Sequence, residues 1–234
     1  MSIIIISPHF DDAALSAWTI LDNFGKKKDI KLLTVCGGIP KVEYNVSSAD
    51  IKCGFSTASE AAITRIKEDL NFCSTLNIKP IHLDEFDYPY TGRKKRETII
   101  SKINTYIKDN DIVYAPLGIG NHPDHIVVRD AILNISLSKN INLFLYFDFP
   151  YASTVNISKS YVKDLGLNDS IQKKLLKNEM VFKNILTDTQ LNKKINNLTI
   201  YNSQIKMLES NYPKLMQKPG ILNIEYFMEV KKID

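Results

Sequence analysis

Segments typical of buried β-strands alternate with segments of helical spacing over the first two-thirds of this 234-residue chain. The series opens with an apolar run, Ile3–Ile6, which Ser7 and Pro8 end, and apolar side chains then recur at helical spacing. We expect strands at 2–7, 31–36, 78–83, 111–115 and 141–147, and helices at 12–24, 58–76, 95–108 and 125–138. This alternation predicts a Rossmann-like α/β fold, in which a mostly parallel sheet carries helices on both faces.

The final third of the chain is less regular and is rich in Lys and Asn. It contains two stretches with helical spacing, near 170–186 and near 188–210, and one strand-like run, from Ile221 to Val230. The length suits one domain, so we expect a core over about residues 1–151 and a helical and strand extension over about 152–234. Residues 37–57 form a long polar connection, which is typical of a lid or a binding loop.

Two short polar clusters contain three of the four histidines of the chain. Residues 9–12 (His-Phe-Asp-Asp) directly follow the first expected strand, and residues 122–125 (His-Pro-Asp-His) follow the strand that ends at Ala115. Ligand sites of doubly wound sheets lie beyond the carboxyl ends of the strands. The two clusters are therefore expected to meet in space, although about 110 residues separate them.

This combination of side chains has a simple chemical use. On a tight turn, His9 and Asp12 can point at one ion while Asp11 points elsewhere. Two imidazoles and one carboxylate form a three-ligand zinc site with an open position for water, which is the arrangement of catalytic zinc. The same ligands also suit Fe²⁺, Co²⁺ or Mn²⁺. The sequence thus predicts a metal-dependent hydrolase.

Each polar residue also has a purely structural interpretation. The aspartates of both clusters could cap the helices that follow them, because aspartate favours that position. His82, the fourth histidine, is interpreted as a satisfied surface or cleft residue rather than a ligand. Arg65 could form an i,i+4 pair with Asp69 instead of facing a cleft.

The two clusters resemble the hallmarks of the PIG-L/LmbE-like family of zinc-dependent N-acetylglucosamine deacetylases. That family has a His-x-Asp-Asp motif after its first strand and a His-x-x-His motif later, as residues 9–12 and 122–125 do here. The resemblance extends over about residues 2–151 and includes Gly54-Phe55, Arg65 with Glu68-Asp69, residues 113–118 (Val-Tyr-Ala-Pro-Leu-Gly) and residues 147–151 (Phe-Asp-Phe-Pro-Tyr). A weaker match, Tyr201-x-Ser203-Gln204, lies in the final third.

The resemblance implies a role for each residue of the first cluster. His9 and Asp12, together with His125, would bind zinc. Asp11 would be the general base that takes a proton from the attacking water. Zinc lowers the pKa of a bound water to about 7, so a hydroxide nucleophile would be available at neutral pH.

The resemblance also implies roles outside the first cluster. His122 would stabilise the oxyanion of the tetrahedral intermediate and help to protonate the departing amine, since an amide needs a proton donor for its nitrogen. Asp124 would orient or charge-stabilise a histidine, His122 in the first place, and could keep it protonated. Arg65 and Asp148 would line the cleft and bind substrate.

Two positions depart from the family pattern, which often has Pro at the second motif position and an acidic residue after the paired aspartates. This chain has Phe10 and Ala13 there. Neither change removes an expected ligand, but Ala13 argues against the branch of the family that acts on a thiol cofactor. The expected substrate is an N-acetylated sugar or aminoglycoside-like compound. This class includes nucleotide- or lipid-linked glycans and natural-product intermediates.

Composition excludes several other classes of protein. The net charge of +4 is modest and the lysines are mostly scattered, so we expect a small-molecule or glycan substrate and no nucleic-acid partner. No stretch is apolar enough for a membrane span, and the N-terminal apolar run is too short for a signal peptide. Cys36, Cys53 and Cys73 show no paired metal-type spacing, which favours reduced thiols in a cytoplasmic protein.

Two other functions remain as alternatives to the deacetylase. One is a metal-dependent amidase or esterase that acts on a non-acetyl substrate. The other is a catalytically inactive sugar-binding protein, although the complete set of histidines and aspartates argues against it. A nucleotide-binding oxidoreductase is excluded, because the first turn contains no Gly-x-Gly-x-x-Gly.

Overall fold

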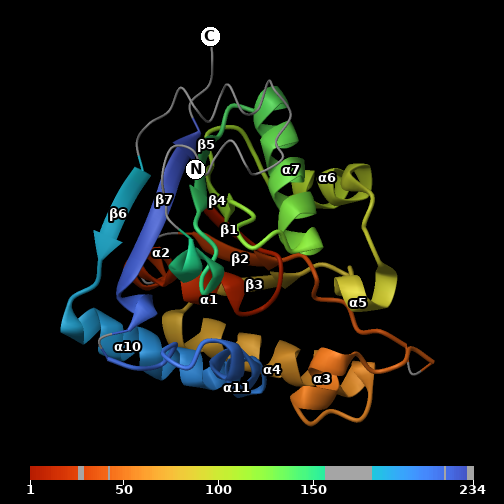
Figure 1. Ribbon diagram of the computed structural model, residues 1–234. Coiled ribbons are helices and arrows are strands. Elements are labelled where there is room, and N and C mark those ends of the chain that lie inside the picture. Colours follow the sequence, from red (N-terminus) through yellow and green to blue (C-terminus); the bar gives the residue numbers. More distant parts are fainter. Residues whose placement is uncertain (26–28, 42, 156–180, 219, 231–234) are drawn as a thin grey trace.

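A seven-stranded sheet with the order β3-β2-β1-β4-β5-β7-β6 forms the centre of the protein (Figure 1). The computed structural model describes residues 1–25, 29–41, 43–155, 181–218 and 220–230. The strands are β1 (Ile3–Ser7), β2 (Ile30–Thr34), β3 (Lys79–His82), β4 (Ile112–Pro116), β5 (Asn142–Tyr146), β6 (Val181–Ile185) and β7 (Ile224–Val230). The first five are parallel, whereas β7 runs antiparallel to β5 and β6 runs antiparallel to β7. The prediction of a mostly parallel sheet is confirmed.

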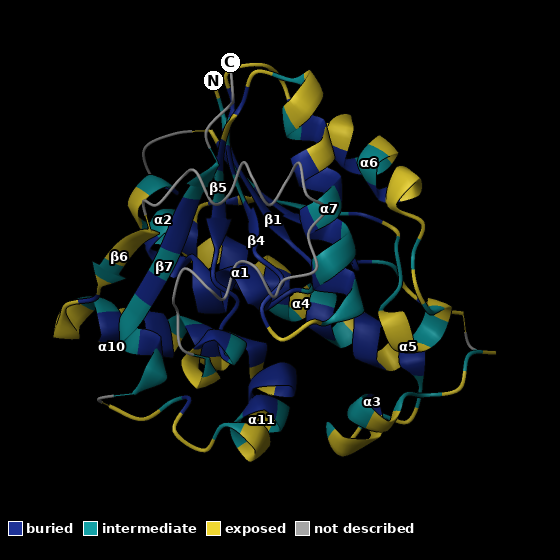
Figure 2. Ribbon diagram, turned by 45° about the horizontal axis from the view of Figure 1, so that its top comes forward, coloured by how far each residue is buried: buried dark blue, intermediate teal, exposed yellow. Residues whose placement is uncertain are grey.

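The first five strands lie where the apolar runs predicted them, with ends that differ by at most two residues. β1 lies in the middle of the sheet, and each of its four isoleucines is at most 1 % exposed. A parallel strand that is covered on both faces needs such a continuous apolar run, because neither face meets water. Figure 2 shows the resulting layer of buried residues along the inner strands.

Helices cover both faces of the sheet, as predicted. They are α1 (Asp12–Ser16), α2 (Trp18–Phe24), α3 (Ser48–Lys52), α4 (Ala58–Leu76), α5 (Tyr88–Thr91), α6 (Arg96–Asn104), α7 (Pro123–Ser138), α10 (Asp188–Leu198) and α11 (Asn202–Asn211), with 3₁₀ turns η1 (Tyr151–Thr154), η2 (Thr199–Tyr201) and η3 (Ile221–Asn223). The helices α6 and α7 lie on one face and α1, α2 and α4 on the other (Figure 1). α10 and α11 pack beside α4.

The sheet reverses its winding direction between β1 and β4, which are direct neighbours with Ile3 paired to Ile112. From β1 the chain continues to β2 on one side, and from β4 it continues to β5 on the other. The connections therefore diverge at the carboxyl ends of these two strands and leave room for a ligand. Both polar clusters follow these strands.

The helix expected over 12–24 is broken into α1 and α2 at Ala17, whose backbone (φ −137°, ψ 28°) is not helical. The break follows from two long-range contacts. The Oγ of Ser16 accepts a hydrogen bond from the backbone N of Phe149 (3.0 Å), and the buried carboxylate of Glu225 accepts one from the backbone N of Thr19 (3.2 Å). The side chain of Glu225 thus replaces a helical carbonyl as the partner of Thr19, which apolar spacing does not reveal.

The structure also corrects the expectations for the connections and the final third. Residues 181–185 were expected to continue a helix from about 170, but they form β6, which pairs with β7 along its length; residues 170–180 lie outside the described residues. The expected helix over 188–210 is divided into α10, η2 and α11. Two short helices inside connections, α3 and α5, were not predicted. α3 begins where the side chain of Ser47 accepts a hydrogen bond from the backbone N of Asp50.

Cys36, Cys53 and Cys73 form no disulfide bond, as expected. In the part of the chain that the structure describes, no helix combines the length and apolarity that crossing a membrane requires.

Candidate metal centre and active site

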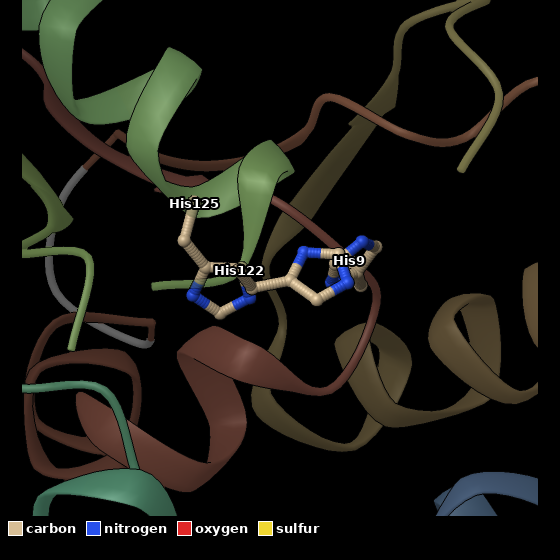
Figure 3. Close-up of side chains that lie close together, drawn as sticks. All are labelled: His9, His122 and His125. Atoms are coloured by element: carbon tan, nitrogen blue, oxygen red, sulfur yellow. The ribbon is translucent and has the colours of Figure 1, made fainter. Parts of the chain in front are cut away.

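The two polar clusters meet beyond the carboxyl ends of β1 and β4, as the sequence predicted. The imidazole side chains of the two clusters lie close together (Figure 3). The ring centroid of His9 lies 4.9 Å from that of His122 and 5.3 Å from that of His125, and the latter two are also 5.3 Å apart. Residues about 110 positions apart thus form one group of side chains.

The turn that carries the first cluster is held by its own hydrogen bonds. The backbone N of Ala13 donates to the Oγ of Ser7 (3.0 Å), and the backbone N of His9 donates to the Oδ2 of Asp12 (2.8 Å). Asp11 occupies the N-cap position of α1, but its side chain accepts no capping hydrogen bond. The Asp11 carboxylate therefore does not cap α1 and is available for other contacts.

Asp12 lies between two histidines, one from each cluster. Its Oδ2 is 3.2 Å from the Nδ1 of His9 and 3.2 Å from the Nε2 of His125. Burial alone would raise the pKa of Asp12, but the adjacent His125 and His9 outweigh it and hold the pKa well below its usual range. Burial would likewise lower the pKa of His125, yet Asp12 and Asp148 raise it to about 9. Without a metal, this group behaves as a carboxylate between two protonated imidazoles.

Asp148 does not line the cleft, which corrects the expectation that it would bind substrate. Its carboxylate is 1 % exposed, and Oδ1 lies 2.7 Å from the Nδ1 of His125. Its Oδ2 accepts hydrogen bonds from the backbone N atoms of Gly118 (2.8 Å) and Ile119 (2.9 Å). Gly118 has a φ of 83°, which favours glycine and turns these two N–H groups toward the carboxylate. Asp148 therefore orients His125.

His122 is the N-cap residue of α7, where its Nδ1 accepts a hydrogen bond from the backbone N of Asp124 (3.3 Å). This contact assigns the ring proton of the neutral imidazole to Nε2. Burial and the neighbouring His9 and His125 lower the pKa of His122 to about 4. His122 is therefore neutral at pH 7, in contrast to the expectation that a carboxylate would keep it protonated.

Asp124 pairs with His9 rather than with His122, which is a further correction. Its Oδ2 lies 3.1 Å from the Nε2 of His9 but 4.0 Å from the Nδ1 of His122. The same carboxylate accepts a hydrogen bond from the backbone N of Tyr88 (2.9 Å) and forms an ion pair with Lys94. Asp124 thus connects a candidate metal ligand to α5 and the residues that follow it.

Lys94 is a site residue that the sequence did not indicate. Lys94 belongs to the basic run of residues 93–96 (Arg-Lys-Lys-Arg), yet its side chain is only 3 % exposed. Burial would lower the pKa of its amine, but Cys36 and Asp124 outweigh it and raise the pKa above its usual value. Nothing in the run distinguishes Lys94 from its neighbours, so only the fold identifies it.

Asp11 faces the cleft from the end of the first turn. It is 5 % exposed, and burial together with the charge of Asp12 raises the pKa of Asp11 to about 7. The side-chain amide of Gln204, on α11, donates a hydrogen bond to the Oδ1 of Asp11 (2.6 Å). A carboxyl group with such a pKa can accept and release a proton near neutral pH.

Arg65 faces the cleft and does not form the alternative pair with Asp69. Its guanidinium forms an ion pair with Asp50, from α3, and lies 3.9 Å from the carboxylate of Asp87. Asp69 instead contacts the Nε2 of His82 at 2.7 Å. His82 thus has a partner outside the metal cluster, in line with its interpretation as a satisfied residue.

A cleft of about 150 Å³ contacts residues of both clusters. Its lining includes polar and charged side chains, among them Arg65, Asp50 and Asp87, and the apolar side chains of Leu15, Met207 and Leu208. His9, Asp11, Asp12 and His122 also line it.

Two groups of described side chains bring potential metal-ligand atoms within 4.8 Å of one another: His9 with His122 and His125, and His9 with Cys36 and Asp124. The second group is the less suitable one. Both oxygens of Asp124 already accept hydrogen bonds, and burial raises the pKa of the Cys36 thiol to about 11. Asp12 joins the first group through its 3.2 Å contacts.

Comparison with known proteins agrees with this geometry. The sequence profile described as GlcNAc-PI de-N-acetylase (PIG-L) matches residues 4–136. A search of curated proteins found no significant match. Among solved structures, the zinc-inhibited form of a teicoplanin deacetylase is 20 % identical over 100 % of this chain and 99 % of its own, with a TM-score of 0.73.

Two more distant structures share the fold. The N,N'-diacetylchitobiose deacetylase of Pyrococcus horikoshii is 16 % identical over 97 % of this chain and 83 % of its own, with a TM-score of 0.60. A 4-carboxy-2-hydroxymuconate hydratase of Pseudomonas putida is 12 % identical over 100 % and 98 %, with a TM-score of 0.55. At such identities the likeness shows the fold alone. The matched profile, however, covers more than half of the chain and includes both polar clusters, so the chain belongs to the PIG-L family of de-N-acetylases.

Proposed function

We propose that this protein is a zinc-dependent hydrolase that removes the N-acetyl group from an amino sugar or a sugar-containing metabolite. Membership of a de-N-acetylase family supports the reaction class. The observation that carries the proposal is the position of Asp12, whose Oδ2 lies 3.2 Å from a ring nitrogen of both His9 and His125. We take the whole chain as one deacetylase domain, because β7, near its C-terminal end, pairs with β5.

The proposed ligands His9, Asp12 and His125 fit a zinc ion. With zinc–ligand distances of about 2.0–2.1 Å, neighbouring ligands of a tetrahedral site are about 3.3 Å apart, close to the two separations of 3.2 Å. Asp148 on the far nitrogen of His125 is a further feature of metal-binding histidines. Fe²⁺, Co²⁺ and Mn²⁺ suit the same ligands.

His122 is the competing third ligand. Its Nδ1 already accepts a hydrogen bond from the helix backbone, and its side chain is 31 % exposed, compared with 1 % for His125. A ligand histidine is usually fixed by a carboxylate or carbonyl on its other nitrogen, which His125 has. We therefore assign His125 to the metal and His122 to the substrate.

The reaction follows from the positions of Asp11 and His122. A bound zinc ion supplies an acidic water and polarises the acetyl carbonyl. Asp11 takes the proton of the attacking water and then, as a carboxylic acid, returns it to the nitrogen of the departing amine. His122 presents its Nε2–H to the oxygen that becomes negative, because its Nδ1 accepts the hydrogen bond from the backbone N of Asp124. Acetate and a free amine are released.

The substrate is proposed to lie along the cleft, with its sugar ring toward the polar side chains of the lining, Arg65, Asp50 and Asp87. Arg65 supplies donors for the hydroxyl groups, and its ion pair with Asp50 holds the guanidinium in place. Asp124 acts indirectly, because its carboxylate fixes the Nε2 side of His9. The apolar lining residues Leu15, Met207 and Leu208 would contact a less polar part of the substrate.

The test measures zinc content and acetate release from N-acetylglucosamine and N,N'-diacetylchitobiose. Wild type, Asp11→Asn, His122→Ala and His125→Ala are compared at one zinc per chain and with excess zinc, because a relative is known in a zinc-inhibited form. We expect Asp11→Asn and His122→Ala to keep zinc and lose most turnover, and His125→Ala to lose zinc. Fe²⁺, Co²⁺ and Mn²⁺ are loaded in parallel.

Three results would contradict parts of the proposal. Substantial turnover by Asp11→Asn would reject the base. Zinc retained by His125→Ala but lost by His122→Ala would assign the third ligand position to His122 instead of His125. Zinc binding without acetate release by wild type would keep the site and direct the search to other amides and to esters.

A further inference from the structure

Gln204 reaches the proposed base from the last third of the chain. It lies in α11, is 8 % exposed, and donates from its Nε2 to the Oδ1 of Asp11 at 2.6 Å. Within the described parts of the chain, this is the one hydrogen bond that another side chain donates to the Asp11 carboxylate. The donor and the acceptor are 193 residues apart.

Two residues that precede Gln204, Tyr201 and Ser203, hold this turn of the chain against α4. The hydroxyl of Tyr201, a fully buried residue, donates to the Oδ1 of Asp69 (2.7 Å). The backbone N and the Oγ of Ser203 donate to the two carboxylate oxygens of Glu68 at 2.8 and 2.6 Å. These contacts hold the first turn of α11 beside the base, so Gln204 has little freedom to move.

The other end of the Gln204 amide indicates why a glutamine occupies this place. Its Oε1 is buried and accepts no hydrogen bond from any residue that the structure describes. Rotation of the amide by half a turn would bring this oxygen against the carboxylate of Asp11, so the orientation is determined by Asp11 alone. A buried acceptor without a partner is destabilising, and an apolar side chain of the same size would avoid that loss. The contact with Asp11 is therefore the feature that a glutamine provides here.

We propose that Gln204 is a positioning residue for the deacetylation, which holds one oxygen of Asp11 so that the other is left for the attacking water. This inference rests on the proposed function, because it requires Asp11 to be the base. It implies that the C-terminal third supplies a part of the active site and does more than extend the sheet.

The experiment replaces Gln204 by methionine, which keeps the length of the side chain and removes the donor. We expect kcat to fall by about 100-fold, the loss that a small misplacement of a reacting group produces, with KM within about 3-fold of wild type. Zinc content should be unchanged, and the melting temperature should be unchanged or higher. Gln204→Asn, which withdraws the amide by one methylene group, should lower kcat in the same direction.

Gln190→Leu is the matched control. Gln190 also lies in the C-terminal third, where its side chain completes the capping box of α10 with Thr187. Its replacement should lower the melting temperature and leave kcat unchanged, which is the result of a purely structural role.

The outcomes separate this inference from the proposed function. Wild-type kcat in Gln204→Met, alongside an inactive Asp11→Asn, would overturn the role of Gln204 and retain the base. An active Asp11→Asn would overturn both. A loss of kcat in Gln204→Met that is accompanied by loss of zinc or a lower melting temperature would identify a structural residue and overturn the inference.

Discussion

Replacing Asp148 by asparagine should weaken metal binding, although Asp148 is not proposed as a ligand. The carboxylate receives three donors: the Nδ1 of His125 at 2.7 Å, and the backbone N atoms of Gly118 and Ile119 at 2.8 and 2.9 Å. Because a carboxylate only accepts hydrogen bonds, it holds the ring proton of His125 on Nδ1. The lone pair is then on Nε2, the nitrogen that faces Asp12 and the proposed metal.

The size of the effect follows from this arrangement. An asparagine has a single acceptor oxygen, which cannot serve both the two backbone N–H groups and His125. If the oxygen stays with Gly118 and Ile119, its NH₂ group faces His125 and drives the ring proton to Nε2, where a metal must displace it. If the asparagine amide is turned over, its NH₂ group faces the buried backbone N–H groups of Gly118 and Ile119, which then have no acceptor. Loss of such an outer partner typically weakens metal binding by 10–100-fold, and we expect about 100-fold, or about 2.7 kcal/mol.

The measurement is the zinc dissociation constant of wild type and Asp148→Asn, determined by competition with a coloured chelator at one pH. Asp130→Asn is the matched control, because Asp130 also follows the second cluster in α7 but pairs with Arg129 (2.9 Å) away from the metal ligands. Thermal unfolding of the metal-free proteins checks that both variants fold. Equal zinc affinity in Asp148→Asn and wild type would refute the argument from the ring proton.

Two other predictions concern stability. Burial would lower the pKa of His125, but Asp12 and Asp148 raise it from 6.5 to about 9. Between these two pH values the metal-free folded protein therefore keeps a proton on His125 that the unfolded chain releases. Its melting temperature should therefore fall between pH 6.5 and 9, and a flat profile would contradict this. Lys194→Met should lower the free energy of unfolding by about 3–5 kcal/mol in urea titrations, because the Nζ of Lys194 lies 2.8 Å from Glu225 and both side chains are fully buried. Lys194→Met combined with Glu225→Gln, which removes the charge but keeps an acceptor for the backbone N and hydroxyl of Thr19, should recover part of that loss. A double variant as unstable as the single one would argue against the ion pair.

The sheet and the meeting of the two clusters could be predicted because both depend on local patterns. An apolar run such as Ile3–Ile6 signals a buried strand, and parallel strands place the residues that follow them at one edge. The spacing of His9 and Asp12 on one tight turn is equally local. None of these inferences needs the identity of a residue far away in the chain.

The hydrogen-bond and ion-pair partners of the aspartates were harder to predict, because they depend on which donors the fold brings next to each carboxylate. Asp148 follows β5 at the ligand edge, which favoured a position in the cleft, but its carboxylate instead accepts hydrogen bonds from the two N–H groups after β4. Asp124 follows His122 closely in sequence, yet it contacts His9 and Lys94. Sequence proximity is a poor guide here, since neighbouring residues at a helix start point in different directions.

The geometry of the first cluster depends on the part of the chain that resembles the family least. α1 has five residues, too few to be stable as an isolated helix. Its end at Ala17 is held where Glu225 accepts a hydrogen bond from Thr19, and its beginning is held where Gln204 contacts Asp11. Both contacts come from the C-terminal third and join residues about 200 positions apart, so no window of local spacing contains them. A motif search can therefore find the chemical groups of this site, but the contact that holds the Asp11 carboxylate and the contact that ends α1 depend on the packing of α11 and β7.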